Sequence, residues 1–477
     1  MIGNGDVWAI AYLSVEWAIR LVMVVVVPLR RSAEASRSWL LLVFFLPIPA
    51  LLIYLLIGRP TYPAWRRRRF GRLNAVLSAA SKEIRHSQFC RRPDLPANLE
   101  GPAALIEKLG HFPALSGNEI EFVSDYGEAI DRLIADIDGA RETVHLMFYI
   151  FVDDETGRRV IDALDRAARR GVKCRVLIDA IGSRRWAGPV SAQLAAAGVQ
   201  VQLALEVGIF RRRSARADLR NHRKIAVVDS RIGYVGSQNI TNAEFRSGLI
   251  NEELVARVVG PVIAELQAVF VADWYMETGE KLDAPALFPH NAPGAKVVAQ
   301  VLASGPDHPD AGIGHLMVAL VHGANERIVL TTPYFVPDEA LLQALKIAAL
   351  RGVEVHLVVS SLVDQVLVSW AQRSYYAELL TAGARIHLYE GRFLHAKHVT
   401  FDDDIALVGS SNLDIRSFVL NAEISLVAFA PQVVDQLRRV QDRYFATSTD
   451  LKLDIWEARS VFRKIGENIA RLASPLL

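Results

Sequence analysis

The most prominent feature of the hydropathy pattern is a pair of apolar segments at the start of the chain. Residues 7–29 and 39–57 are almost continuously apolar, and each is about long enough, as a helix, to cross a hydrocarbon core of roughly 30 Å. We therefore predict two transmembrane helices within residues 1–60. For the first segment the alternatives are a helix lying in the membrane interface and a cleaved signal peptide, which the lack of a preceding Lys or Arg disfavours.

Polar and proline residues complicate these two segments. Glu16 and Arg20 are four residues apart, so a helix places them on one face, where they can form an ion pair. Pro47 and Pro49 each lack a backbone N–H donor, so they kink the second helix or make it re-entrant. The pattern leaves open whether residues 39–57 cross the membrane fully.

The arginines around the apolar segments predict their orientation. Fewer arginines lie between the two segments than after the second one: Arg30, Arg31 and Arg37 against Arg59, Arg66, Arg67, Arg68, Arg69 and Arg72. Basic residues accumulate on the cytoplasmic side of a membrane. We therefore expect the body of the protein to lie in the cytoplasm.

After a polar connector, short apolar strands alternate with amphipathic helices, which is typical of an α/β protein. Residues 142–180 match residues 326–361: each has a strand, a helix, an Arg-Gly-Val turn and a second strand. The glycine after each helix is a C-cap signal. We predict two pseudo-symmetric α/β domains, each a strand-rich sheet flanked by helices. The expected parts are the transmembrane pair (1–60), the connector (61–116), a first domain (117–290) and a second domain with a C-terminal helix (291–477).

A second pair of matched segments, residues 221–239 and 394–412, carries polar residues in register. Each segment reads as two apolar strands around a turn. Matched positions recur at a constant spacing of 173 residues: His222 and His395, Lys224 and Lys397, Asp229 and Asp402, Gly236 and Gly409, Ser237 and Ser410, Asn239 and Asn412. A duplicated structural hairpin explains the glycines and aspartates, but it does not explain a histidine and a lysine in both copies.

The His-Lys pairs favour a chemical role. Side chains two residues apart on a strand point to the same side, so His222 shares a face with Lys224, and His395 with Lys397. A lone histidine on a strand is more often a core residue than a catalyst. Two identical pairs at matched positions favour catalysis.

Asp229 and Asp402 have two interpretations. Both lie where an apolar run ends, in the turn-forming sequences Asp-Ser-Arg and Asp-Asp-Asp. They are either structural turn residues, which the turn context favours, or members of the catalytic set.

Further polar groups follow each histidine. Each copy has a serine and an asparagine (Ser237 and Asn239, Ser410 and Asn412) and then an Asn-x-Glu triplet ending at Glu253 or Glu423. These glutamates lie 31 and 28 residues after the histidine of their own copy. Imidazole, ammonium, neutral donors and a carboxylate that fixes the histidine tautomer together suit a tetrahedral phosphate. Phosphodiester transfer needs one imidazole to attack phosphorus and another to protonate the leaving oxygen, which explains the duplication.

Composition narrows the function classes. The chain is 51% hydrophobic, and its mean hydropathy of +0.21 indicates contact with lipid. A formal net charge of +2 is too balanced to indicate nucleic-acid binding, and two cysteines, Cys90 and Cys174, exclude a disulfide framework. No cluster of metal-ligand residues recurs in both halves and no Gly-rich phosphate loop is present, so we expect neither a metal nor another cofactor.

The motif His-x-Lys-x4-Asp followed by x6-Gly-Ser-x-Asn, present twice, resembles the phospholipase D superfamily from about residue 117 onward. Within that superfamily the whole chain is similar to the membrane-anchored bacterial cardiolipin synthases. The similar stretches are YLLIGRP after the second apolar segment, DWYMETGE (273–280), TTPYFVPDE (331–339), RSYYAELLTAGARIHLYEG (373–391), GSSNLDIRSF (409–418) and the C-terminal ARLASPLL.

This resemblance implies a phosphatidyltransferase that joins two phosphatidylglycerol molecules into cardiolipin, releases glycerol and passes through a phosphatidyl-histidine intermediate. It also implies a multi-pass protein of the bacterial inner membrane with no nucleic-acid partner; the oligomeric state stays open. The implied roles are catalysis by His222 and His395, with the first as nucleophile; phosphate contacts from Lys224, Lys397, Asn239 and Asn412, with Ser237 and Ser410 nearby; and histidine orientation by Glu253 and Glu423.

Two kinds of alternative stay open. The first is another enzyme of the same superfamily: a hydrolytic phospholipase D, a phosphatidylserine synthase or a membrane-tethered nuclease, although a nuclease would need a longer basic or aromatic path. The second is a non-catalytic lipid-binding protein, which would be expected to have lost a His or Lys in one half.

Two further segments bear on membrane contact. Residues 211–224 form a basic loop that is either a site for anionic head groups or an ordinary solvated loop. Residues 454–472 place Trp456, Val461, Phe462, Ile465 and Ile469 near one helical face. We expect that face to pack on the body of the protein rather than to contact the membrane.

Overall fold

The computed structural model describes residues 4–31, 33–58, 64–208, 215–216, 218–282, 296–306 and 312–472. Arg59 and the first residues of the basic loop, 211–214, lie outside the described residues. The expectations that rest on them therefore stay predictions.

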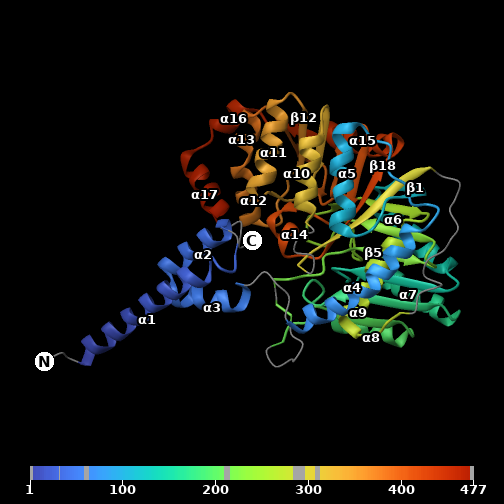
Figure 1. The fold of residues 1–477 in the computed structure, drawn as a ribbon, viewed down its shortest axis with the longest axis horizontal. Helices are drawn as coiled ribbons and strands as arrows, with labels where there is room; N and C mark the ends of the chain where they lie inside the picture. The colour runs from blue at the N-terminus through green and yellow to red at the C-terminus, as the bar shows by residue number, and fades with distance from the viewer. Residues whose placement is uncertain are drawn as a thin grey trace.

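Three helices form the N-terminal anchor: α1 (Asn4–Val26), α2 (Ala33–Phe45) and α3 (Pro47–Ile57). Figure 1 shows α1 projecting away from the body, with α2 and α3 at its base. Among the described helices, only α1 is long and apolar enough to cross a membrane, over Val7–Val26.

The second apolar segment, residues 39–57, is interrupted at Leu46, as expected from Pro47 and Pro49. The helix stops at Phe45, and Pro47 starts a new one, because proline has no N–H to extend a helix but fits the first turn of the next. Helices of 13 and 11 residues span about 20 Å and 16 Å. Neither is long enough to cross a core of roughly 30 Å.

The anchor has a small core of its own. Met23 of α1 and Val27, directly after it, pack with Trp39 and Tyr54 of the two shorter helices. The expected ion pair of Glu16 and Arg20 is confirmed at 3.2 Å. The three helices therefore form one packed unit.

The connector is helical. It contains α4 (Ala64–Arg85) and α5 (Ala97–Gly110). The first element of the repeated body follows at Leu115.

The first half of the body contains α6 (Tyr126–Gly139), α7 (Glu155–Arg169), α8 (Ala187–Ala196) and α9 (Ile263–Thr278). Its strands are β1 (Leu115–Val123), β2 (Thr143–Phe148), β3 (Lys173–Asp179), β4 (Gln200–Ala204), β5 (Ile225–Val228), β6 (Ile232–Gly236), β7 (Asn251–Glu252) and β8 (Val255–Val259).

The second half contains α10 (Ile313–Gly323), α11 (Glu339–Leu350), α12 (Val366–Ser374), α13 (Tyr376–Thr381), α14 (Ile415–Val419), α15 (Pro431–Ala446), α16 (Leu453–Glu457) and α17 (Val461–Leu472). Its strands are β9 (Val297–Ser304), β10 (Arg327–Thr331), β11 (Phe335–Val336), β12 (Glu354–Ser360), β13 (Arg385–Tyr389), β14 (Phe393–Leu394), β15 (His398–Phe401), β16 (Ile405–Gly409), β17 (Leu413–Asp414), β18 (Glu423–Phe429) and β19 (Ser448–Asp450).

The helices of the two matched units have the same N-terminal and C-terminal capping features. Asp154 and Asp338 cap the N-termini of α7 and α11 by accepting a backbone N–H bond three residues on. Gly171 and Gly352 follow these helices with φ values of 89° and 94°, a conformation that glycine adopts without strain. The predicted C-cap glycines are confirmed.

The two halves form one continuous sheet, in which equivalent strands follow in the same order outward from the join. The strand order is β19-β13-β12-β10-β15-β16-β18-β9 in the second half, continuing into β1-β8-β6-β5-β2-β3-β4 in the first. The halves meet where β1 pairs antiparallel with β9. Matched strands such as β5 and β15 occupy equivalent places on either side of this join, so the predicted duplicated α/β fold is confirmed.

Helices cover both faces of this sheet (Figure 1). One face of the first half packs against α6, α7 and α8, and the matching face of the second half against α5, α10 and α11. The other face has a shared core, where α9 and α15 lie over strands from both halves. The halves are therefore joined by a common core as well as by the β1–β9 pairing.

Asp229 and Asp402 lie in the turns after β5 and β15, each with a φ of 49°. The Asp229 carboxylate accepts hydrogen bonds from the backbone N–H groups of residues 141–143, and Asp402 binds those of residues 325–327 in the same way. Both carboxylates therefore fasten the turn to the start of the neighbouring strand. Both aspartates lie at the far end of the strand from the histidine and outside the lining of the cavity that contains His222 and His395, which favours the turn role over a direct catalytic one.

Asp402→Ala should destabilise the fold because three backbone donors lose their acceptor. We expect the free energy of unfolding to fall by about 2–4 kcal/mol, measured by denaturant titration of the detergent-solubilised chain. Asp403→Ala is the matched control, since Asp403 only forms an exposed ion pair with Arg438 and should change stability by less than about 1 kcal/mol. Equal unfolding midpoints for the two variants would contradict the turn role.

Candidate active site

A cavity of about 300 Å³ lies between the two halves and is lined by both matched histidines. Equivalent polar residues approach it from each half: His222 and Asn239 from the first, His395 and Asn412 from the second. The duplication therefore builds one site rather than two.

The histidines lie just before their strands, not on them. His222 precedes β5 by three residues, and His395 lies between β14 and β15. Both segments are extended and pair with the opposite half. The N–H of His222 donates to the carbonyl oxygen of Ala422 (2.9 Å), and the N–H of His395 donates to that of Glu252 (2.8 Å).

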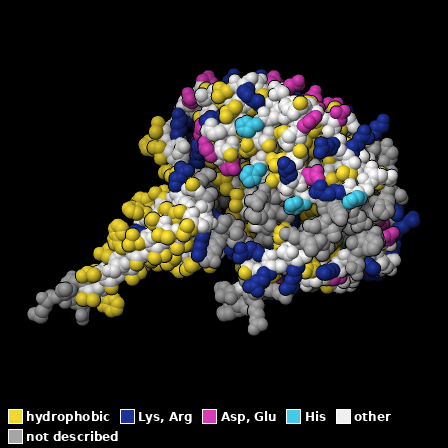
Figure 2. All heavy atoms as spheres, in the orientation of Figure 1, with side chains coloured by type: hydrophobic (Ala, Val, Ile, Leu, Met, Phe, Trp, Pro, Cys, Tyr) yellow, Lys and Arg dark blue, Asp and Glu magenta, His cyan; other side chains and the backbone are white. Residues whose placement is uncertain are grey.

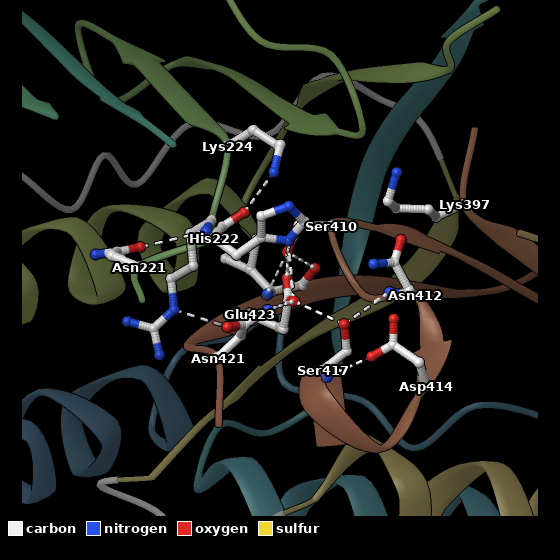
Figure 3. Close-up of polar contacts among 12 residues, drawn as sticks. Asn221, His222, Lys224, Lys397, Ser410, Asn412, Asp414, Ser417, Asn421 and Glu423 are labelled. Atoms are coloured by element: carbon white, nitrogen blue, oxygen red, sulfur yellow. Dashed lines mark hydrogen bonds and ion pairs between the residues drawn. The ribbon is translucent and has the colours of Figure 1, made fainter. Parts of the chain in front are cut away.

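This backbone pairing places each glutamate beside the histidine of the other half. Glu423 follows Ala422, and its carboxylate lies 2.9 and 3.0 Å from Nδ1 of His222. Glu253 follows Glu252, and its Oε1 lies 2.7 Å from Nδ1 of His395. Figure 3 shows Glu423 beneath the His222 ring. Neither glutamate contacts the histidine of its own copy. The unequal offsets of 31 and 28 have a separate origin, because the segment between Asn239 and Arg246 is three residues longer than the segment between Asn412 and Arg416.

Both imidazoles are neutral at pH 7. Burial lowers the pKa of His222 to about 4, against the opposing effect of Glu423, and burial likewise lowers the pKa of His395. With Nδ1–H donating to a carboxylate, Nε2 of each ring keeps its lone pair. Each ring therefore presents a nucleophile or base to the cavity.

The two carboxylates stay charged. Burial by itself raises the pKa of Glu423, but the interaction with His222, the charge of Lys224 and the hydrogen bond from the Ser410 hydroxyl outweigh it, so the pKa is lowered. The pKa of Glu253 is lowered in the same way against its burial, mainly by His395. A fixed negative charge therefore lies behind each imidazole.

The glutamates differ in the number of donors that reach them. Glu423 accepts hydrogen bonds from Ser410 Oγ (2.5 Å) and Ser417 Oγ (3.0 Å) besides its histidine (Figure 3). Ser237, the match of Ser410, donates to the carbonyl oxygen of Leu254 (3.2 Å), and its hydroxyl also contributes to the lowered pKa of Glu253. Oε2 of Glu253 accepts no hydrogen bond within the described part of the chain. The two halves are therefore chemically unequal.

The lysines lie behind the histidines and are fully buried. Lys224 Nζ donates to the carbonyl oxygen of His222 (2.7 Å), and Lys397 Nζ donates to that of His395 (2.5 Å). Neither belongs to the cavity lining. Burial lowers the pKa of Lys224 to about 7 and that of Lys397 to about 8.

The asparagines face the cavity directly. Asn239 Oδ1 accepts a hydrogen bond from the N–H of Ile150 (3.0 Å), which leaves its NH₂ group as a donor. Asn412 also lines the cavity, and its Oδ1 has no hydrogen-bond partner among the described residues. These amides supply neutral donors on both sides of the site.

Sequence reasoning missed several residues of the site. Arg246, Arg416, Tyr149 and Tyr334 line the cavity, and the Tyr149 ring packs edge-on against His222 at 4.9 Å. The available signal was a repeated Arg-Ser dipeptide at 246–247 and 416–417. It follows the two asparagines at different offsets, so the matched spacing did not reveal it.

Arg223, between His222 and Lys224, was missed as well. Its Nε donates to the carbonyl oxygen of Glu423 (3.0 Å) and its Nη2 to that of Ser304 (3.1 Å), while Nη1 pairs with Asp273. This buried guanidinium ties the first half to two strands of the second. It holds the backbone that carries Glu423.

This geometry places two neutral imidazoles, each backed by a carboxylate, around one cavity with amide and guanidinium donors. One imidazole can attack phosphorus while the other exchanges a proton with the departing oxygen. The fold and the site therefore define a phosphodiester-transfer enzyme of the phospholipase D type.

A family model described as "Cardiolipin synthase, PLD-like domain" matches residues 133–274 and 317–444. Cardiolipin synthase A of Yersinia pseudotuberculosis serotype O:3 (strain YPIII) and that of Yersinia pestis are each 34% identical over 460 residues, covering 94% of both chains. The crystal structure of phosphatidylserine synthase from Haemophilus influenzae Rd KW20 superposes with a TM-score of 0.58 at 15% identity, over 80% of this chain and all of that one. The last likeness concerns the fold alone. The chain belongs to the cardiolipin synthase family.

The low lysine pKa values predict pH-dependent anion binding. As the pH rises through about 7 to 8, Lys224 and Lys397 lose their charge, so tungstate, whose own charge stays constant over this range, should bind more weakly at about pH 9 than at about pH 6. Calorimetric titration of Lys224→Gln should show weaker binding and a smaller pH effect. Exposed Lys173→Gln is the control. A wild-type affinity independent of pH would contradict the assignment.

Proposed function

We propose that this chain is a cardiolipin synthase that transfers a phosphatidyl group from one phosphatidylglycerol to the terminal glycerol hydroxyl of another. The observation that supports this most strongly is the pair of histidines, one from each half, that line the same cavity. A transfer reaction needs a nucleophile and an acid on opposite sides of one phosphorus atom, and the duplicated fold provides both.

In the first step, His222 Nε2 attacks phosphorus and the bond to the leaving glycerol oxygen breaks. His395, protonated when the anionic diester binds beside it, gives its proton to that oxygen. The product is a phosphatidyl-His222 intermediate, and the positive charge on its ring faces the Glu423 carboxylate. Free glycerol leaves the site.

In the second step, neutral His395 takes the proton from the hydroxyl of the second phosphatidylglycerol. That oxygen attacks phosphorus, the bond to His222 breaks, and cardiolipin forms. His395 returns to its protonated state, so the two steps balance as two phosphatidylglycerols giving cardiolipin and glycerol.

The unequal glutamates support His222 as the nucleophile. The Glu423 carboxylate accepts hydrogen bonds from Ser410 and Ser417, which lowers its basicity. It therefore stabilises a positive charge on His222 less strongly, and the ring stays neutral. Glu253 has a carboxylate oxygen that accepts no hydrogen bond within the described residues, which makes it the stronger partner for a charged His395. A general acid needs that partner.

The remaining polar residues have supporting roles in this proposal. Asn239 and Asn412 donate to the phosphate oxygens, and Lys224 and Lys397 supply positive charge from behind the histidines. Ser410 and Ser237 form hydrogen bonds next to the glutamates and help to position them. Asp229 and Asp402 stabilise the turns after β5 and β15. The reaction uses side chains alone.

The proposed organisation follows the expected parts: an anchor at 1–60, a connector at 61–116, and phospholipase D-like domains at 117–290 and 291–477. The starts of β1 at Leu115 and of β9 at Val297, close to the proposed bounds, support this division. Helix α1 supports attachment to the bacterial inner membrane. The arginine cluster after the apolar segments supports a cytoplasmic body.

The full chain, reconstituted with phosphatidylglycerol as the only lipid substrate, should release glycerol and cardiolipin in equal amounts. Lipid products separated by mass spectrometry and glycerol measured enzymatically test this directly. Phosphatidic acid as the sole lipid product would show a hydrolase and contradict the proposal.

His222→Asn and His395→Asn should each lower the rate by about a thousandfold or more, because each removes one half of the proton and bond exchange. Only His395→Asn can accumulate a phospho-histidine adduct. Exposed His322→Asn is the matched control and should keep the wild-type rate. Activity retained by either of the first two variants would contradict the two-histidine mechanism.

A further inference from the structure

Helix α17 carries its apolar side outward. Phe462 is 87% exposed and Ile469 is 61% exposed, although both are large hydrophobic residues. On the opposite side of the helix Glu467 is buried and forms a two-bond ion pair with Arg459 (2.6 and 2.9 Å). The expectation that this helix packs its apolar face on the body is therefore wrong. Of the five apolar residues predicted to share this face, only Trp456, in the preceding helix, is buried.

Helix α12 extends this apolar surface, and it too has exposed apolar side chains and a buried polar one. Leu367 and Trp370 are nearly half exposed, whereas the polar Gln372 is buried and binds the N–H of Phe335 (2.8 Å). The helices touch where a Cβ on Gly466 would come within 3.0 Å of the Trp370 ring. We call this the α12–α17 surface; its exposed apolar residues are Val366, Leu367, Trp370, Val461, Phe462, Ile465, Ile469 and Leu472.

The α12–α17 surface is continuous with the membrane anchor. Ser38 of α2 donates a hydrogen bond to the carbonyl oxygen of Leu472 at the end of α17 (3.4 Å). Figure 1 shows α2 next to α12 and α17. In Figure 2, hydrophobic side chains cover the anchor and appear again at the edge of the body near α16 and α17. A membrane that receives α1 would therefore approach this edge of the body.

The α12–α17 surface also adjoins the active-site cavity. Gln365 and Val368, at the start of α12, line the cavity, while Val366 and Leu367 between them are exposed. Ile415 of α14 lines the cavity too, and Val419 of the same helix is 45% exposed. A diacyl lipid could thus place its head group in the cavity while its chains remain against apolar side chains.

We propose that the α12–α17 surface docks into the interfacial layer of the membrane that holds α1, and that phospholipid enters the active site along it. This inference rests on the proposed function, because a phosphatidyl donor and acceptor must be drawn from a bilayer. Amphipathic helices bury their apolar face to a depth of about 5–10 Å at such an interface. Exposed Arg463 next to Phe462 suits the anionic head groups of phosphatidylglycerol.

Membrane depth provides a test that does not need catalysis. An environment-sensitive fluorophore is attached at Phe462→Cys in a Cys90→Ser background, since Cys174 is buried, and the full chain is reconstituted into vesicles containing nitroxide-labelled phosphatidylcholine. The matched control is Leu350→Cys on α11, a position that is 72% exposed. We expect strong quenching at position 462 and little at position 350. Equal quenching at the two positions would overturn the inference.

The rate on two forms of substrate tests lipid entry. Phe462→Glu combined with Ile469→Glu should lower turnover of vesicle phosphatidylglycerol by about fivefold or more and leave turnover of monomeric short-chain phosphatidylglycerol unchanged. The control pair, Ile347→Glu with Leu350→Glu, adds the same charges at exposed apolar positions of α11 and should affect neither rate.

Two outcomes would overturn this part of the inference. Loss of both rates in the Phe462/Ile469 variant would show a structural role, and conversion of an oligomer to a monomer, measured by light scattering, would show that the surface joins two copies of the chain. Failure of the proposed function is distinguishable from either. In that case the wild type would make no cardiolipin, while quenching at position 462 would still report whether the surface enters the membrane.

Discussion

The interaction on which the site depends is the crossed pairing of histidine and glutamate between the two halves. His222 is oriented by Glu423 and His395 by Glu253, and the backbone bonds of His222 to Ala422 and of His395 to Glu252 hold this arrangement. Neither half can therefore orient its own histidine. Catalytic competence follows from the docking of the halves, so the shared core under α9 and α15 is as necessary to the reaction as the imidazoles.

Burial gives this crossed pairing its chemical effect. The glutamates, lysines and histidines lie in a region where solvent is largely excluded, so a charge is stable only beside its partner. That environment keeps the free imidazoles neutral and ready to attack or to accept a proton. Arg223 contributes without touching the cavity, because its bonds to the carbonyl oxygens of Glu423 and Ser304 fix the strand that carries the carboxylate.

Much of the fold and the identity of the site residues followed from the sequence, because duplication repeats both periodicity and motif. The repeat predicted the βαβ units, the C-cap glycines and the histidine pair. The contact of each histidine with the glutamate of the other half was not predictable, because spacing within one copy carries no information about contacts with the other copy. The offsets of 31 and 28 residues showed only that the two copies differ in length between the histidine and the glutamate. The outward orientation of the apolar face of α17 was not predictable for a similar reason. A hydrophobic stripe identifies a helix face, but only the buried Glu467–Arg459 pair shows that the polar face points inward.

The most direct test of the crossed pairing uses a phosphatidyl donor with a nitrophenol leaving group, which needs no general acid. Formation of the His222 adduct then depends on Glu423, and its resolution by the acceptor depends on Glu253. Rapid-quench kinetics should show that Glu423→Gln slows the nitrophenol burst, whereas Glu253→Gln keeps the burst and slows the steady state. The opposite pattern, a burst that fails in Glu253→Gln and persists in Glu423→Gln, would show that each glutamate serves its own half and would contradict the account.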